Sequence, residues 1–379
     1  MSSEKKIYIM IDENKEIETR KNSRIISADI IRVLAMLMIV VLHTVLNFTI
    51  RPDFFLTKAW FVFEPLVVFS KIGVLLFFML SGYLVINKNR GIKKNLDKTL
   101  KRIFIPLCFF TVLDLTFNFT NYSFYKNYDL LFWQHQLIGF TNLAVFSQWF
   151  LTALLFIYLL NPVWNLVFSQ KNSSIAIYLV KIAFAFSLIS TILKYPSLNS
   201  AHFFNNFTLW TGFVAFYLFG GLVRNKWVKF SNRTYLTMVI VGFLMMVVGD
   251  FYAKYANIHA LNNWSVYFLE YLSIPVVITA IGTFGLLISQ QFSWLTISSL
   301  GRRFYEVLKA VAVLSFGVFL IHPYVVSILS GMGFSFDKLH VNVYLYNILN
   351  FCFVLGISMM FTFIIKQVPK LRMIIGEYD

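Results

Sequence analysis

An arginine and a histidine stand at the two ends of one apolar stretch, "RVLAMLMIVVLH", which runs from Arg32 to His43. Eleven helical steps of about 100° come to within about 20° of three full turns, so a helix places both side chains on one face, about 16 Å apart along its axis. Asp29 precedes Arg32 by three residues, a spacing at which two side chains can pair on a helix. This face predicts a water-filled path with an anion site at Arg32 and a base at His43.

A simpler interpretation of the pair stays open beside this one. Arg32 can extend its guanidinium to the lipid headgroups, and His43 can donate a single packing hydrogen bond. A charged arginine inside a membrane span costs about 3 kcal/mol or more, so it normally faces protein or water. The cost of placing Arg32 in the span therefore favours a functional role for the Arg32–His43 pair over the simpler interpretation.

The stretch "GVLLFFMLSGYL" carries Ser81 followed by Gly82. Small residues allow two membrane helices to approach closely, and we expect this role first. Ser81 could act as a nucleophile only with a base within hydrogen-bond reach.

A strongly basic stretch, "NKNRGIKKNLDKTLKRIFIP", follows over residues 87–106. It predicts a cytoplasmic loop that touches anionic lipid, and it can also form a mouth that gathers phosphates. Lys101 and Arg102 lie at the start of an apolar stretch and are candidates for binding an anionic ligand.

Two further apolar stretches contain candidate residues. Trp149 in "QWFLTALL" has the position of an interfacial anchor. His322 in "FGVFLIHPYVV" precedes Pro323, and because a proline frees backbone carbonyls in a span, a histidine there can bond them. No zinc, nucleotide or dinucleotide motif occurs, so we expect no metal site.

The composition shows which kind of fold must position these residues. The chain has 379 residues, of which 58% are hydrophobic and 13% charged, and its mean hydropathy is +0.71. A soluble protein could not bury that much apolar surface. The net charge of +16 comes in short basic runs between apolar stretches, a pattern typical of membrane loops and not of nucleic-acid binding. The sequence therefore predicts an all-α polytopic membrane protein.

About ten stretches are long enough to cross about 30 Å of hydrocarbon. They fall near residues 25–48, 62–87, 103–120, 149–168, 175–193, 207–223, 235–252, 265–289, 310–330 and 343–366. With both termini inside, the inner segments hold 24 Lys and Arg and the outer loops 6, which predicts cytoplasmic termini. We expect tails at 1–24 and 367–379, a transmembrane domain at 25–366, and an outer loop at 121–148 that dips toward the membrane.

Taken together, these motifs resemble the acyltransferase-3 family of integral membrane O-acyltransferases. The resemblance begins with "DIIRVLAMLMIVVLH" and continues through "GVLLFFMLSGYL", "KRIFIP", "QWFLTALL" and "FGVFLIHP" in the expected order. It implies an acyl-CoA donor, usually acetyl-CoA, used from the cytoplasm without a tightly bound cofactor. The acceptor it implies is a hydroxyl of an envelope glycan or lipid-linked sugar. It implies that Arg32 contacts the coenzyme and His43 is catalytic, with supporting roles for Asp29, Ser81, Trp149 and His322.

The helical geometry agrees with this expectation. A coenzyme head held by Arg32, Lys101 and Arg102 would leave its pantetheine arm to run along the first helix to His43. His43 could then take the proton of the attacking hydroxyl, while an acyl-enzyme route stays open. The Asn, Lys, Ile and Phe usage points to an AT-rich bacterium, and we expect a multi-pass protein of its plasma membrane.

Two other classes share part of this pattern. A flippase or transporter of a lipid-linked saccharide would also have many spans, but we would expect inverted hydropathy repeats, which we do not find. A polysaccharide polymerase would carry a large Arg-rich outer loop, whereas the predicted outer loops hold few basic residues. We expect acyl-CoA, a sugar acceptor and the lipid bilayer as partners, and no nucleic acid.

Overall fold

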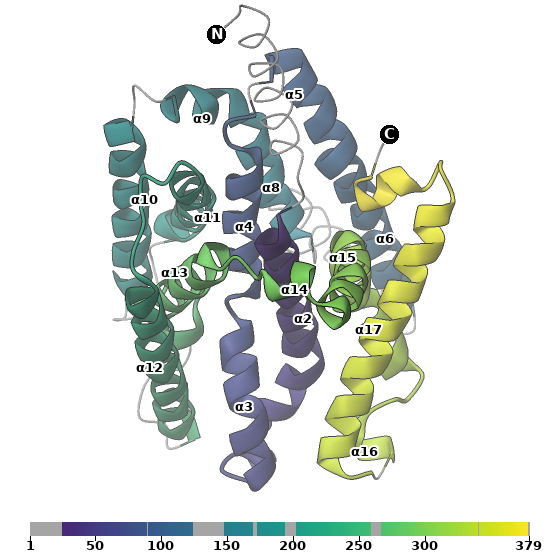
Figure 1. The fold of residues 1–379 in the computed structure, drawn as a ribbon. Coiled ribbons are helices and arrows are strands. Elements are labelled where there is room, and N and C mark those ends of the chain that lie inside the picture. The colour runs from purple at the N-terminus through teal and green to yellow at the C-terminus, as the bar shows by residue number, and fades with distance from the viewer. Residues whose placement is uncertain are drawn as a thin grey trace, which may run out of the picture.

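The fold is known from a computed structural model, and every element it describes is helical (Figure 1). It describes residues 25–88, 90–123, 148–169, 173–193, 202–258, 267–339 and 341–377. Most of the predicted outer loop at 121–148 lies outside these residues.

Helix α2 (Ile26–Thr49) is the central element of the bundle. It packs against α3 (Lys58–Ser70), α4 (Gly73–Val85), α15 (Ser299–Gly331) and α17 (Val343–Gln367). Because neighbours surround it, most of its apolar side chains are buried, while Arg32 is half-buried and His43 is exposed. The two chemically distinctive residues of α2 therefore keep access to space that the packing leaves open.

Helices α4 and α11 (His202–Arg224) approach each other through glycines. A Cβ added at Gly82 would lie 1.7 Å from the carbonyl oxygen of Tyr217, and one at Gly220 would lie 1.9 Å from that of Met79. No side chain fits in either place. The close-packing role predicted for Gly82 is confirmed.

Two breaks between helices lie next to prolines. Helices α8 (Trp149–Leu159) and α9 (Asn161–Val167) meet at 56°, next to Pro162. Between α5 (Ile92–Thr99) and α6 (Ile105–Ser123), residues Leu100–Phe104 form a π-helical turn, η2. Pro106 follows that turn and has no N–H to donate to the carbonyl of Arg102, which favours the wider turn there.

A buried ion cluster joins α3 to α12 (Asn232–Ile258). Lys254 Nζ lies 2.6 Å from Glu64 Oε1 and 3.1 Å from Asp250 Oδ2, and both carboxylates are buried. Breaking such a cluster leaves an uncompensated charge in the apolar interior, so it fixes how the two helices pack.

Each of the ten predicted apolar stretches overlaps a helix or a helix pair. The remaining elements are η1 (Pro52–Phe54), α10 (Ser173–Leu193), η4 (Tyr267–Leu269), α13 (Ile274–Ser289), α14 (Trp294–Ile297), α16 (Phe336–Leu339) and η5 (Arg372–Ile375). Within the described ranges, six helices are long and apolar enough to span a membrane, or seven if the bent α8–α9 pair is one span. The number ten and the side of the termini therefore stay predictions.

Candidate active site

A cavity of about 230 Å³ opens beside the first turns of α2, and we call it the basic cavity. Its walls come from α2, α4, the α4–α5 connection, α5, η2, α8, α9 and α15. Five cations line it, while the described lining residues include no Asp, Glu or His; the cations are Arg32, Lys88, Arg90, Lys98 and Arg102. A cavity with that lining attracts a polyanion.

Arg32 is held at this cavity by a neighbour one helical turn away. Its Nη1 lies 3.2 Å from Asp29 Oδ1, which confirms the pairing predicted from their spacing. Asp29 is buried and also accepts a hydrogen bond of 3.3 Å from the hydroxyl of Tyr305 on α15. The sequence pattern did not indicate Tyr305, because 276 residues separate it from Asp29. The Arg32 side chain is 26% exposed, and so it remains accessible to a ligand.

The crowding of positive charge perturbs the two lysines of the cavity. Burial and the charges of nearby arginines lower the pKa of Lys88. The neighbouring charge of Arg90 is the main reason that the pKa of Lys98 is lowered. Such repulsion is relieved when an anion enters, so the cavity gains from binding one.

Two neighbouring cations that the sequence suggested together are separated by the structure. Arg102 lines the basic cavity, whereas Lys101 is not among its lining residues and pairs with Asp97 at 2.8 Å. Successive residues of a helix point about 100° apart, so the two side chains diverge. Ser81 lies in the basic cavity, whose described lining residues include no His, Asp or Glu to serve it as a base.

His43 and His322 lie side by side, although 279 positions separate them in the sequence. Their ring centroids are 5.0 Å apart, with the ring planes at 58°. His43 comes from the second half of α2 and His322 from the second half of α15, two helices packed against each other. The sequence suggested each histidine separately, and only the fold brings them together.

The backbone of α15 fixes the orientation of His322. Its Nδ1 lies 2.8 Å from the carbonyl oxygen of Phe319 and 3.2 Å from that of Val318. Pro323 has no N–H for the Phe319 carbonyl, so the histidine supplies the missing donor, as the sequence predicted. Because a carbonyl only accepts, Nδ1 carries the hydrogen and Nε2 carries a lone pair. That Nε2 is buried and has no hydrogen-bond partner among the described residues.

A second cavity, of about 220 Å³, lies at the other end of α2, and we call it the aromatic cavity. His43, Asn47 and Arg51 line one side, and residues of α15, α16, α17 and the α15–α16 connection line the other. Phe319, which lines the basic cavity, has its ring centroid 6.0 Å from that of His322. The two cavities thus approach the histidine pair from opposite ends of α2.

A second buried polar group lies near His322. The hydroxyl of Tyr324 lies 2.5 Å from Oδ1 of Asp114 on α6 and accepts a hydrogen bond of 3.3 Å from Gln148. Trp149, expected as an interfacial anchor, is partly buried and packs against Phe213 and Tyr271 at centroid distances of 5.3 and 5.5 Å. Hydropathy alone does not separate an anchor from a packed ring, since both begin a span.

The arrangement fits chemistry that joins an anionic donor to a polar acceptor at an imidazole. Among the residues that the structure describes, no three His, Cys, Asp or Glu side chains gather as metal ligands. The sequence matches a family model described as an acyltransferase domain, that of the acyltransferase-3 family, over residues 25–366. Comparison with curated proteins and with solved structures gave no match. With a match over most of its length, the chain belongs to the acyltransferase-3 family and is a membrane acyltransferase.

Proposed function

We propose that this protein moves an acyl group, most simply acetyl, from cytoplasmic acyl-CoA to a hydroxyl of an envelope glycan or lipid-linked sugar. The observation that carries the proposal is the histidine pair, which lies between a cavity lined by five cations and a second cavity of different character. The predicted orientation puts the basic cavity on the cytoplasmic side and the aromatic cavity outside.

The donor occupies the basic cavity with its phosphates. Arg32 and Arg102 can each hold a phosphate through two parallel N–H donors, and Lys88 and Lys98 add point charges. From Arg32 the pantetheine arm runs along α2 toward His43, about 16 Å away at 1.5 Å per residue. Phe319 lies on this route, so its ring must turn aside or stack along the arm for the thioester to reach the histidines.

Transfer then needs one base and one electrophile in contact. His43 takes the proton of the acceptor hydroxyl while the oxygen attacks the thioester carbonyl. The C–O bond forms, the C–S bond breaks, and the thiolate that leaves takes the proton back from His43. His322 is a positioning residue in this scheme, since its fixed Nδ1–H leaves Nε2 to accept a hydrogen bond from the His43 ring.

The test compares substitutions of His43 at matched membrane levels. His43→Ala and His43→Gln should both fold and bind acetyl-CoA, and both should lose acyl transfer by a factor of about 10² to 10⁴, the usual contribution of a general base. His340→Gln, in a predicted outer loop, is the matched control. Transfer by His43→Gln near the wild-type rate would exclude the base and overturn the mechanism.

The donor half of the proposal has its own test. Arg32→Lys keeps the charge but loses the two-pronged geometry, so acetyl-CoA should bind more weakly to it, and more weakly still to Arg32→Ala. Arg303→Ala controls for loss of a cation, because Arg303 is exposed and does not line the cavity. If Arg32→Ala binds acetyl-CoA with unchanged affinity, Arg32 does not bind the donor, and its role is contact with the lipid headgroups.

A further inference from the structure

The aromatic cavity differs from the basic cavity in the charge it offers. Apart from His43, its described lining residues include only two charged side chains, Arg51 and Asp337, and these two are paired. A negatively charged ligand would therefore find five cations in one cavity and no free cation in the other.

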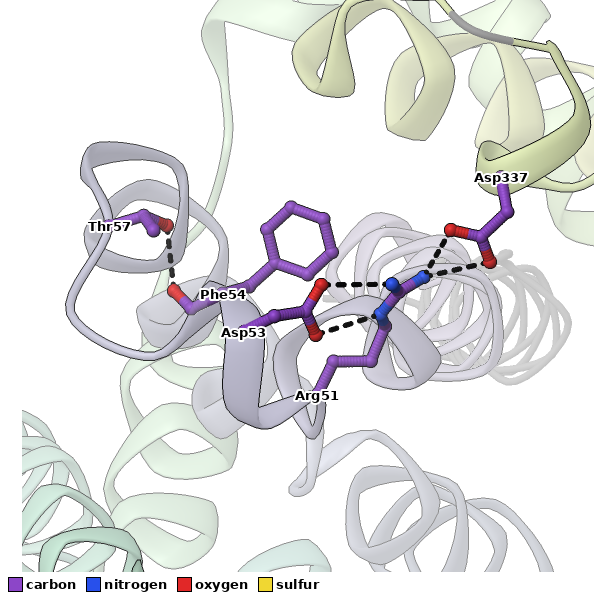
Figure 2. Close-up of polar contacts among 5 residues, drawn as sticks. All are labelled: Arg51, Asp53, Phe54, Thr57 and Asp337. Carbon is purple, nitrogen blue, oxygen red and sulfur yellow. Dashed lines mark hydrogen bonds and ion pairs between the residues drawn. The ribbon is translucent and has the colours of Figure 1, made fainter.

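Carboxylates surround the guanidinium of Arg51 (Figure 2). Its Nη1 lies 2.8 and 2.9 Å from the two carboxylate oxygens of Asp337. Nε and Nη2 lie 3.1 and 2.9 Å from the two oxygens of Asp53. The hydrogen bonds from Asp53 and Asp337 raise the pKa of Arg51, and Arg51 lowers the pKa of Asp53. The cluster carries a net charge of −1 at the mouth of the cavity.

The cluster also joins two distant segments. Arg51 follows α2 directly, and Asp337 lies 286 residues later on α16. The Arg51 guanidinium stacks over the ring of Phe54 at 4.9 Å, and the carbonyl of Phe54 accepts a hydrogen bond of 2.7 Å from Thr57, the N-cap of α3. Because each contact restrains the next, the mouth of the cavity has a defined shape without a ligand.

The walls contain aromatic rings with polar groups beside them. Tyr346 packs against Phe334 and Phe336 at 5.8 and 5.7 Å, and Phe48 lies 6.4 Å from Phe336. Amides and hydroxyls complete the lining, from Thr44, Asn47, Ser330, Ser335 and Asn350. A sugar ring has matching features, since its C–H faces pack on aromatic rings and its edge carries hydroxyls. The volume is that of about seven water molecules, enough for one ring.

We propose that the aromatic cavity is the acceptor site and that it selects an uncharged sugar ring over an anionic one. This inference rests on the proposed function. Asp53 and Asp337 repel an acidic sugar and withhold Arg51 from it. The first hydroxyls of a neutral ring bound there face His43, which lines the same cavity.

Protection of a cysteine tests the site without requiring turnover. Ser330, near the end of α15, is exposed and lines the cavity, and Lys338, on α16, is exposed but does not line it. In a chain with Cys108 and Cys352 replaced by Ala, Ser330→Cys is labelled with a membrane-impermeant maleimide, and Lys338→Cys is the control. The neutral probes are maltotriose, N,N′,N″-triacetylchitotriose and the trimethyl ester of trigalacturonate, and the anionic probe is trigalacturonate itself, with the same rings as its ester.

At about four times its dissociation constant, a neutral trisaccharide should slow labelling of Ser330→Cys about fivefold by occupancy alone. It should leave Lys338→Cys unchanged, and trigalacturonate should protect neither cysteine. Failure of all three neutral sugars to protect Ser330→Cys would overturn the site, and equal protection by trigalacturonate and its ester would overturn the selection by charge.

A variant of the two aspartates distinguishes selection by charge from selection by the shape of the cavity. Asp53→Asn with Asp337→Asn leaves an uncompensated Arg51, so trigalacturonate should gain affinity about fivefold, the worth of a partly exposed ion pair of about 1 kcal/mol. Adding Arg51→Gln should abolish that gain, and a gain that persists would refute the role of Arg51.

Protection of Ser330→Cys that survives in His43→Ala, with acyl transfer lost, supports both proposals. Protection with normal transfer in His43→Ala would keep the sugar site and overturn only the catalytic mechanism.

Discussion

Gly82→Ala tests the close contact between α4 and α11 directly. The new methyl group would lie 1.7 Å from the carbonyl oxygen of Tyr217. A carbon and a carbonyl oxygen come no closer than about 3.3 Å, so the two backbones must separate by about 1.6 Å. The opposing atom belongs to the backbone of α11, and it cannot rotate away as a side chain would.

That displacement sets the expected magnitude. Overpacking of a core costs about 1 to 3 kcal/mol, and we expect Gly82→Ala at the upper end or above, because a whole helix must move. Ser81 lies next to Gly82 and lines the basic cavity. A shift of about 1 Å in a reacting site can cost about 10² in rate, so acyl transfer should fall by about that factor in the protein that still folds.

The assay is unfolding of the purified protein in mixed micelles, followed by tryptophan fluorescence, with transfer measured on the same preparations. Gly356→Ala is the matched control, since Gly356 lies in α17 and a Cβ there meets nothing within 4 Å. We expect the control to be neutral or more stable by up to about 1 kcal/mol from helix propensity.

Gly220→Ala supplies a further check on the geometry. Its methyl group would collide with Met79 across the same interface, so a helix already displaced by Gly82→Ala relieves part of the second clash. The double variant should therefore cost less than the sum of the two single variants, by more than about 0.5 kcal/mol. Wild-type stability of Gly82→Ala, or an equal loss in Gly356→Ala, would refute the close contact.

Three other outcomes follow from the structure. A cysteine replacing exposed Lys94 should be labelled only from the cytoplasm, and one replacing Asn342 only from outside; the reverse would invert the orientation. Lys254→Met should lower the free energy of unfolding by about 3 to 5 kcal/mol, because it leaves two buried carboxylates without their cation; an unchanged midpoint of denaturant unfolding would contradict this. The KM for acetyl-CoA should rise with alkaline pH, beginning below the usual lysine pKa, since the pKa of Lys98 is lowered and its charge is lost early. Lys98→Arg should move that rise to higher pH, and an identical pH profile would remove Lys98 from the donor site.

Local spacing predicted the features that lie within one helix. The pairing of Asp29 with Arg32 needs only a separation of three residues, and the bond from His322 to the Phe319 carbonyl needs only the neighbouring proline. The apolar stretches located the helices for the same reason, because hydropathy is a local property.

Features that depend on how helices pack were not predictable from spacing. The contact of His43 with His322 depends on how α2 meets α15. Which of Lys101 and Arg102 faces the basic cavity depends on the π-helical turn before Pro106. The sequence likewise predicted a cytoplasmic loop over residues 87–106, but Asn95 within it is buried at 4% exposure and donates a hydrogen bond of 2.8 Å to the Tyr158 carbonyl. Labelling experiments should therefore use Lys94.

The position of the histidine pair between two cavities has an electrical consequence. In the proposed transfer the charged part of the donor never leaves the basic cavity. One acyl group moves from the coenzyme to the acceptor oxygen. One proton moves the other way, from the acceptor hydroxyl to the coenzyme thiol. The acyl group counts as one positive charge, so the two movements cancel. A membrane potential does work of about 2.3 kcal/mol per charge per 100 mV, and here no net charge moves across it. Turnover should accordingly proceed at the same rate in energised and in depolarised vesicles.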